Sequence, residues 1–296
     1  MDKAHILDGN NFFSRVFFAG GRSVSSVIGA FIKTRQRYKG KFLVTFDTTK
    51  SERRLARYPE YKAGRKSSLS PEEYEVFKKN LNAFITIVKN MKVAVLEGHG
   101  YEADDYVAIL CKMLKRYHVH IHSTDQDFLQ LVSDNVTVMK PDGEGGALAI
   151  TPDNFFEIVG VPQKFFVDYK AMVGDKSDNI PGIDGIGPGK ASKYINEYGC
   201  YEDIVEALKP KLCETKKSKM PNATEKKLLD GMNSVSLART LVDLSLVYDD
   251  ENLKNLVREK VKNTKLDLEA ILETLTEVDS EECFDVVRAA CKTFTV

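Results

Sequence analysis

The sequence has no excess of charge of either sign, because 43 Lys and Arg residues balance 43 Asp and Glu residues in 296. The composition therefore gives no sign of nucleic-acid binding, although a net charge of zero can hide separate positive and negative patches. The five cysteines are odd in number and show no C-x-x-C spacing. That pattern argues against a disulfide framework or a zinc site and for a reducing compartment.

Long hydrophobic runs are also missing. No apolar stretch approaches about eighteen residues, and the first residues contain no apolar core of a signal peptide. We therefore expect a cytoplasmic protein without a membrane span. The five histidines form no ligand pattern, and no Ser-His-Asp or Cys-His arrangement stands out. With 43% hydrophobic residues, the chain can bury a large core in one or two domains.

Short apolar strands alternate with amphipathic helices in the first half of the chain. We expect strands at residues 4–7, 42–46, 93–96, 119–122 and 136–139, and helices near residues 24–32, 71–88 and 102–116. Residues 70–73, Ser-Pro-Glu-Glu, form a capping box with proline at the first helical position. Alternation implies right-handed crossovers, which predicts an α/β fold with a mainly parallel central sheet flanked by helices. Residues after 150 have an all-helical pattern.

Acidic residues recur where these strands end or helices begin. The set comprises Asp8, Asp47, Glu102, Asp104, Asp105, Asp125, Asp127, Asp175 and Asp178. Parallel sheets bind ligands beyond the carboxyl ends of their strands, so the first seven should meet on one edge. Two carboxylates ~4 Å apart repel by about 4 kcal/mol at an effective dielectric constant near 20, so a convergent set needs cations. Oxygen ligands alone suit Mg²⁺ or Mn²⁺ better than Zn²⁺. For any single acid, a helix cap or a solvated charge is the better interpretation.

Residues 50–69 are polar and basic and lack a sustained apolar period. Tyr58 and Tyr61 are interleaved with the basic residues. This combination suits a single nucleic-acid strand, because cations follow its phosphates and rings stack on its bases. A solvated loop explains the segment alone equally well. Its position directly after Asp47 favours the functional interpretation.

Residues 182–191 are rich in glycine and lead into a helix. Glycines before a helix let backbone N–H groups approach a phosphate closely. The stretch is not a Walker A loop, because Asp184 stands where that motif needs glycine and Ala191 where it needs Ser or Thr. The alternative is a plain turn between two helices, which rarely needs four glycines.

Taken in order, these motifs resemble the 5′-nuclease (flap endonuclease) family, which includes phage 5′–3′ exonucleases and the 5′-nuclease domain of bacterial DNA polymerase I. The matching stretches are Leu7-Asp-Gly-Asn-Asn, Phe46-Asp47, Tyr58-Pro-Glu-Tyr-Lys62-Ala-Gly-Arg65, Glu102-Ala-Asp-Asp105, Ser123-Thr-Asp-Gln-Asp127 and Val173-Gly-Asp-Lys-Ser-Asp-Asn-Ile-Pro-Gly182, followed by Gly185-Ile-Gly187. Each stretch is weak alone, but the ordered set is specific and covers roughly residues 4–200.

The resemblance implies a catalytic, PIN-like α/β core at residues 1–150, which includes a helical arch at residues 50–90. It implies a helical DNA-binding part at residues 151–296, with a helix–three-turn–helix motif near residues 170–200 that can hold K⁺. Two Mg²⁺ ions, replaceable by Mn²⁺, are expected: one at Asp8, Asp47, Glu102, Asp104 and Asp105, the other at Asp127, Asp175 and Asp178, with Asp125 near both. Lys62 and Arg65 would contact the scissile phosphate region. The expected DNA-binding residues are Arg57, Tyr61, Lys62, Arg65, Lys66, Gly185, Gly187, Gly189 and Lys190.

The activity implied is hydrolysis of phosphodiester bonds near the 5′ end of DNA, at flaps, nicks and free 5′ ends, including RNA primers on DNA. Two metal ions ~4 Å apart would activate water and stabilise the leaving oxygen. We expect a monomer that acts in replication or repair, in the host cytoplasm if a phage encodes it. Two alternatives stay open. The complete acid set argues against a non-catalytic DNA-binding scaffold, and the arch and the helix–three-turn–helix argue against a related RNA-cleaving nuclease.

Overall fold

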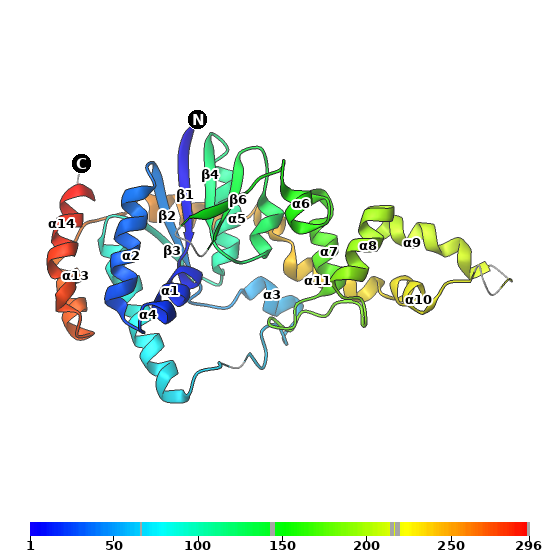
Figure 1. Ribbon diagram of the computed structural model, residues 1–296, viewed down its shortest axis with the longest axis horizontal. Helices are drawn as coiled ribbons and strands as arrows, with labels where there is room; N and C mark the ends of the chain where they lie inside the picture. Colours follow the sequence, from blue (N-terminus) through cyan, green and yellow to red (C-terminus); the bar gives the residue numbers. More distant parts are fainter. Residues whose placement is uncertain (66, 143–145, 214–215, 217–219, 295–296) are drawn as a thin grey trace.

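The structure is a computed structural model that describes residues 1–65, 67–142, 146–213, 216 and 220–294. Within these residues lies a six-stranded sheet with the strand order β3-β2-β1-β4-β5-β6 (Figure 1). The strands are β1 (Asp2–Asp8), β2 (Lys41–Phe46), β3 (Ala94–Glu97), β4 (Tyr117–His122), β5 (Val136–Pro141) and β6 (Ala147–Ile150). The first five pair in parallel and β6 pairs antiparallel with β5, so the predicted mainly parallel sheet is confirmed.

Helices make up most of the remaining described chain. They are α1 (Gly9–Ala19), α2 (Val24–Arg37), α3 (Glu52–Arg57), α4 (Pro71–Asn90), α5 (Ala103–Met113), α6 (Phe155–Val159), α7 (Phe166–Val173), α8 (Pro188–Tyr198), α9 (Tyr201–Leu208), α10 (Ala223–Asp230), α11 (Met232–Val242), α12 (Glu251–Lys262), α13 (Leu268–Glu277) and α14 (Phe284–Phe294). Short 3₁₀ helices are η1 (Asp127–Leu131), η2 (Gln163–Phe165), η3 (Lys209–Cys213), η4 (Leu244–Val247) and η5 (Glu281–Cys283). None of the described helices combines the length and apolar character needed to cross a lipid bilayer.

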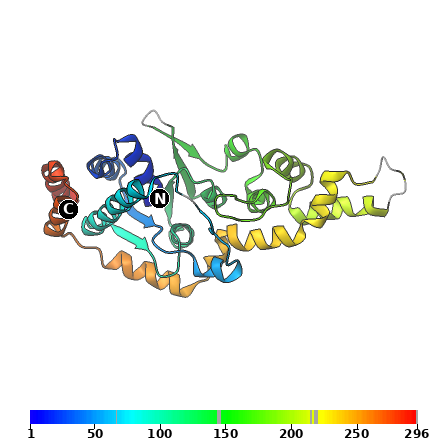
Figure 2. The same ribbon diagram turned by 90° about the horizontal axis from the view of Figure 1, so that it is seen from below.

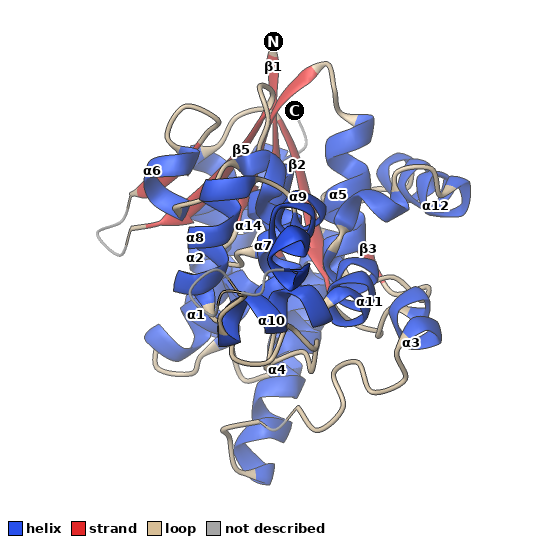
Figure 3. Ribbon diagram, turned by 90° about the vertical axis from the view of Figure 1, so that its right-hand side faces the viewer, coloured by secondary structure: helices blue, strands red, loops and turns tan. Residues whose placement is uncertain are grey.

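Strands β1, β2 and β3 are buried on both faces, which explains their nearly continuous buried runs, whereas buried residues alternate with less buried ones along β4 and β5. Along β1, Ala4 and Ile6 belong to the core layer beneath α5. Leu7 belongs to the opposite layer, which α1, α2 and α4 cover. Figure 3 shows helices on both sides of the strands. The carboxyl ends of the parallel strands therefore form one edge that side chains from both layers can reach.

Two elements near this edge were not expected from the sequence. Helix α1 follows β1 without a loop, because the Asp8 carboxylate accepts a hydrogen bond from the backbone N–H of Asn11 and caps the helix. Sequence reasoning missed this helix even though its buried residues, Gly9, Phe12, Phe13 and Phe17, recur at helical spacing on one face. Strand β6 is only four residues long and partly exposed, so its sequence shows almost no alternation of apolar and polar residues.

The arch begins with α3 and ends with α4. The predicted capping box is present at the start of α4, where Ser70 accepts a hydrogen bond from the Glu73 N–H and Glu73 accepts one from the Ser70 N–H. The buried residues of α4 lie only in its second half, from Ala83 to Val88. Its first half therefore extends past the carboxyl edge of the sheet. The linking residues cross beneath that edge to α3 (Figures 1 and 2).

The helices after β6 occupy two places. Helices α6 to α11 lie beyond β5 and β6, and α8, α9 and α10 project furthest from the sheet (Figure 1). Helix α12 crosses back to contact β3 and α5, and α13 packs on α4. The predicted range 151–296 thus contains one group of helices beside the acidic edge and another that braces the opposite side of the sheet.

Three histidines from neighbouring strands gather at one face of the sheet. His5 is 3% exposed, its Nδ1 lies 3.0 Å from His122 Nε2, and its ring stacks on His120 with centroids 4.9 Å apart. Burial, reinforced by His120, lowers the pKa of His5 to about 4. Burial and the neighbouring His5 lower the pKa of His122 to about 3. The cluster is therefore neutral at pH 7.

This cluster should make the fold sensitive to acid. Below the ordinary histidine pKa of 6.5, the unfolded chain binds protons that the folded cluster resists, so stability present above pH 6.5 is lost toward pH 4. Replacing His122→Gln should flatten this dependence, measured as the free energy of unfolding in urea at pH 7, 6, 5 and 4. His118→Gln on the same strand is the control, because His118 is exposed. Equal pH slopes in the wild type and His122→Gln would contradict the assignment.

Candidate active site and nucleic-acid interface

Asp8 lies at the centre of the acidic edge, at the end of β1. One carboxylate oxygen accepts the Asn11 N–H at 3.1 Å, and the other accepts the Ser123 hydroxyl at 2.7 Å. Burial, with smaller contributions from nearby Asp47 and Asp125, raises the pKa of Asp8 to about 7, and the two hydrogen bonds oppose this rise. A carboxylate in this position needs a nearby positive charge to stay ionised.

Asp47 follows β2 and turns toward the start of α5. Its carboxylate accepts a hydrogen bond from the Ala103 N–H at 2.5 Å, and its own N–H donates to Asn10 Oδ1 at 2.8 Å. Burial raises the pKa of Asp47, whereas Lys62 opposes this rise. The Asp47 side chain thus ties the end of a strand to the helix that presents Asp104.

Asp104 is the acid with the fewest compensating contacts. Its side chain has no hydrogen-bond or ion-pair partner in the part of the chain that the structure describes. Burial and Asp47 raise its pKa well above the ordinary value, and Asp125 and Asp127 add to the rise against an opposing effect of Arg54. Asp104 is therefore a carboxylate that faces other carboxylates.

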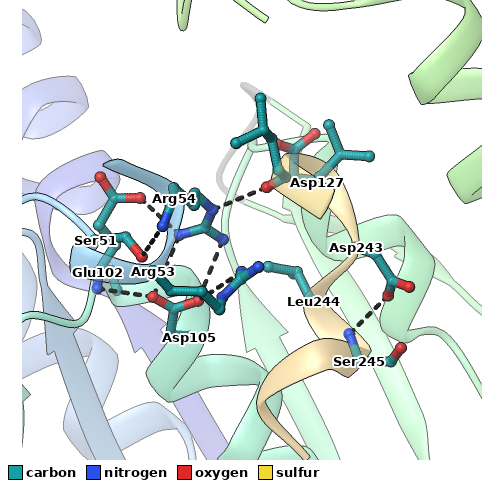
Figure 4. A network of polar contacts seen from close by, with 12 residues as sticks. Ser51, Arg53, Arg54, Glu102, Asp105, Asp127, Asp243, Leu244 and Ser245 are labelled. Carbon is teal, nitrogen blue, oxygen red and sulfur yellow. Dashed lines mark hydrogen bonds and ion pairs between the residues drawn. The ribbon is translucent and has the colours of Figure 1, made fainter. Parts of the chain in front are cut away.

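Glu102 and Asp105, on either side of Asp104, belong to a buried ion-pair network (Figure 4). Arg54, which is 2% exposed, donates to Glu102 Oε2 at 2.7 Å and lies 3.2 Å from Asp105 Oδ1. Arg53 approaches the same Asp105 oxygen at 3.6 Å. The Tyr61 hydroxyl donates to Glu102 Oε2 at 2.9 Å. Both acids are therefore neutralised by the arch itself.

Lys62 connects the arch to both groups of acids. Its backbone has a left-handed φ of 54°, and its N–H donates to the Asp178 carbonyl at 2.8 Å. Its ammonium lies 2.9 Å from Glu102 Oε1 and 3.8 Å from Asp178 Oδ2, and its side chain is 10% exposed. Arg65 is more exposed, at 58%, and lies 3.8 Å from Asp178. The arch thus places one enclosed and one open cation at the acidic edge.

The remaining acids come from two loops. Asp125 Oδ1 accepts the Asp127 N–H at 2.9 Å, which opens η1. Asp175 Oδ1 accepts the N–H and the hydroxyl of Ser177, at 2.8 and 2.7 Å, which shapes the loop after α7. Lys170 on α7 joins these loops, because its ammonium lies 2.7 Å from Asp127 and 3.6 Å from Asp175. All nine predicted acids thus lie in one connected neighbourhood.

The glycine-rich turn lies between α7 and α8. Gly185 has a φ of +74°, and the Lys190 ammonium donates to its carbonyl at 2.9 Å. Gly187 precedes Pro188 at the start of α8, and open space surrounds the positions that a Cβ of Gly187 or Gly189 would occupy. A groove lined by Tyr58, Lys170, Asn179 and residues 182–188 runs from this turn to the second acid group. The turn therefore presents backbone and a helix N-terminus to an open surface.

Some predicted DNA-binding residues differ from expectation. Tyr61 is 2% exposed and is held on Glu102, so its ring cannot stack on a base in this structure. Its aromatic character is used to pack the arch on the core, where Arg54 also lies near its ring. Arg57 is exposed on α3. Lys66 lies outside the described residues.

Sequence reasoning missed Arg54 and Lys170. Arg54 looks like one more solvated cation among the basic residues of the arch, and only its deep burial reveals its role. For Lys170 a signal was available, since it stands four residues after the buried Phe166 and so lies on the same face of α7. A lysine on the inner side of a helix needs a negative partner.

The donor set fits a hard divalent cation. Among the described side chains, no three His, Cys, Asp or Glu residues are gathered closely enough to hold one ion together. Mg²⁺ typically takes only one or two carboxylates and keeps several waters, so a loose acidic edge meets its needs. The unpartnered Asp104 beside Asp47 is the local feature that a cation would relieve.

Comparison with protein families supports this description. Residues 3–160 match the model of the 5′–3′ exonuclease N-terminal resolvase-like domain, and residues 161–265 match that of the 5′–3′ exonuclease C-terminal SAM fold. A 5′–3′ exonuclease of Aquifex aeolicus is 30% identical, with 94% of this chain and 96% of the relative covered. The thermostable DNA polymerase I of Thermus filiformis is 34% identical over 84% of this chain. The chain spans only 30% of that polymerase.

Solved structures give the same picture. The bacteriophage T5 5′-exonuclease with bound zinc ions has a TM-score of 0.73 and 25% identity, covering 89% of this chain and 100% of that one. A T5 flap endonuclease in a pseudo-enzyme–product complex with DNA and metal ions has a TM-score of 0.72, 25% identity and coverages of 88% and 98%. The catalytic core of Rad2 in complex with DNA substrate, 16% identical with a TM-score of 0.53, covers 97% of this chain and 90% of its own, and shows the fold alone.

The buried network gives a stability prediction. Arg54→Met should lower the free energy of unfolding by about 3 to 5 kcal/mol, because Glu102 and Asp105 would be left buried without their main counter-ion. Urea denaturation at pH 7 measures the loss. Arg57→Met on the same helix is the matched control, and its exposed side chain should contribute no more than about 0.5 kcal/mol. Equal unfolding midpoints for the two variants would refute the role of Arg54.

Proposed function

The chain belongs to the 5′–3′ exonuclease family, and from this premise we propose that it is a Mg²⁺-dependent 5′-nuclease. Its substrates would be DNA flaps, nicks and free 5′ ends, including RNA primers on DNA. The observation that carries the proposal is the acidic edge, where Asp104 faces Asp47, Asp125 and Asp127 with no partner in the described chain. A cation bound there would remove a repulsion that the folded protein otherwise retains.

The proposed metal sites are built from the nine acids, in two groups. Asp8, Asp47 and Asp104 are available at the first site, and Glu102 and Asp105 support them through Arg54. Asp127, Asp175 and Asp178 form the second group, with Asp125 between the two. Bound Mg²⁺, with Mn²⁺ as a substitute, would supply the Lewis acidity that phosphodiester hydrolysis requires. A K⁺ ion at the turn between α7 and α8 belongs to the same proposal.

The chain's own residues would orient the nucleic acid. The Lys62 ammonium, held between Glu102 and Asp178, lies where it can neutralise charge that develops on the scissile phosphate. Arg57 and the exposed Arg65 would follow the phosphates of a strand that passes the arch. The turn at Gly185 to Lys190 would hold the duplex by its backbone, so selection would follow DNA structure and not base sequence. We propose residues 151–296 as the helical DNA-binding part, with the helix–three-turn–helix near residues 170–200, in a monomer that acts in the cytoplasm.

A labelled 5′-flap substrate tests this function directly. Cleavage should require Mg²⁺, stop on addition of EDTA, and leave a product of defined size. Substrate binding with no metal-dependent product would favour a DNA-binding scaffold instead. Cleavage of single-stranded RNA in preference to flap DNA would indicate the RNA-cleaving alternative.

Substitution of the second acid group should separate catalysis from binding. Asp127→Asn and Asp175→Asn should each reduce flap cleavage by at least about 100-fold, because each removes a proposed metal ligand, while DNA affinity stays within about threefold. Asp104→Asn should behave in the same way. Asp134→Asn, at an exposed position after η1, is the control. Near-normal turnover by the Asp127 and Asp175 variants would end the proposal.

The arch lysine should act in the chemical step. Lys62→Ala is expected to reduce the single-turnover cleavage rate at saturating enzyme by about 10²-fold or more, since a fixed charge beside the phosphate is lost. Equilibrium binding of the flap, measured by fluorescence anisotropy in Ca²⁺, should change far less. A change confined to KM would show that Lys62 only binds substrate.

A further inference from the structure

Lys170 on α7 contacts an acid of η1 and an acid of the loop after α7, and among the described residues it is the cation that these two share. Its ammonium is 2.7 Å from Asp127 Oδ1 and 3.6 Å from Asp175 Oδ2. The Lys170 side chain is 12% exposed, and those of Asp127 and Asp175 are 18% and 26% exposed. Water therefore screens these pairs only partly.

The position of Lys170 is set by the helix that carries it. Ala171 and Met172, the next two residues of α7, are fully buried, and α7 packs along α11. The Lys170 side chain is itself enclosed, at 12% exposure, so its stem cannot swing freely into solvent. Asp127 and Asp175 lie 48 residues apart in the chain, yet both turn toward this one ammonium. Lys170 is the charge that lets two like-charged loops approach each other.

The same two carboxylates belong to the second proposed metal group. A divalent ion that takes Asp127 Oδ1 competes with the ammonium, because both are drawn to the same oxygen and two cations so close together repel each other. Two functions are thus combined in one ion pair: it stabilises the metal-free fold, and it competes with the metal.

We propose that Lys170 is a built-in counter-ion of the second acid group, which holds Asp127 and Asp175 together before a divalent cation binds and is displaced from Asp127 when it does. The inference rests on the proposed metal site. Lys170 acts here through the carboxylates, as a positioning residue. It sets the threshold of metal concentration at which the second ion enters.

Removal of the ammonium tests the proposal without any turnover. Lys170→Met keeps the length of the stem but removes the charge, and Lys170→Gln is a second neutral variant. Mn²⁺ binding is measured by isothermal titration calorimetry and by electron paramagnetic resonance, at pH 8 and without DNA. The weaker of the two sites should bind Mn²⁺ about fivefold more tightly in both variants, since the competing ion pair is gone. Lys170→Arg should remain close to the wild type.

Lys176→Met is the matched control. Lys176 lies in the same loop as Asp175, but it is exposed and forms no ion pair with the described residues. Its removal changes the net charge by the same amount without freeing Asp127. An equal gain in affinity for Lys176→Met and Lys170→Met would reveal a general field effect and overturn the inference, as would unchanged or weaker Mn²⁺ binding by Lys170→Met.

Thermal unfolding supplies an independent readout. In EDTA, Lys170→Met should melt below the wild type, because Asp127 and Asp175 then repel without compensation. Saturating Mn²⁺ should remove most of that difference. A purely structural salt bridge would instead leave the same difference with and without Mn²⁺, which would contradict the proposal. Failure of the wild type to bind any Mn²⁺ would refute the metal site itself and so the proposed function, a result distinct from either outcome for Lys170.

Discussion

Repulsion among carboxylates is the constraint on which the arrangement of this molecule depends. Parallel strands end at one edge, and the sequence places acids at several of those ends. The pKa of Asp8 rises to about 7 and that of Asp104 rises well above its ordinary value, because burial and neighbouring acids disfavour their charged forms. Such an edge is stable only if cations from elsewhere in the chain, or from solution, approach it.

Each protein cation at the edge comes from a segment outside the sheet. Arg54 and Lys62 belong to the arch, and Lys170 belongs to α7. The attraction between the acids and these cations therefore attaches the arch and the helical part to the core. This differs from a hydrophobic attachment, because the same contacts can be exchanged for contacts with metal ions or with phosphates. The segments that would handle the substrate are those that hold the acids when none is bound.

The sequence was a good guide to what local patterns encode. Short strand patterns of four or five residues located β1 to β5, and the Ser70–Glu73 capping box located the start of α4. The family resemblance named the acids, and the strand ends explained why they meet. The sequence did not reveal which charged or polar side chains are buried. Tyr61 and Arg54 belong to a stretch whose sequence is typical of a solvated basic loop, yet both side chains are 2% exposed. Their partners Glu102 and Asp105 lie far along the chain, so no local pattern indicates this burial.

The end of α11 shows how the helical part is joined to the acids. The last carbonyls of a helix have no partners within it and carry partial negative charge. Here Arg53 donates to the Thr240 carbonyl at 2.7 Å and Arg54 to that of Leu241 at 2.8 Å. Gln130 donates to the Val242 carbonyl at 3.0 Å and to the Asp127 carbonyl at 2.9 Å.

Three side chains that satisfy one helix end thus also contact both acid groups. Helix α7 leads into the glycine-rich turn and packs on α11. The turn is therefore connected to the acids through α7 and the end of α11. Tight hydrogen bonding at this helix end therefore matters for the geometry of the site as much as for the stability of the helix.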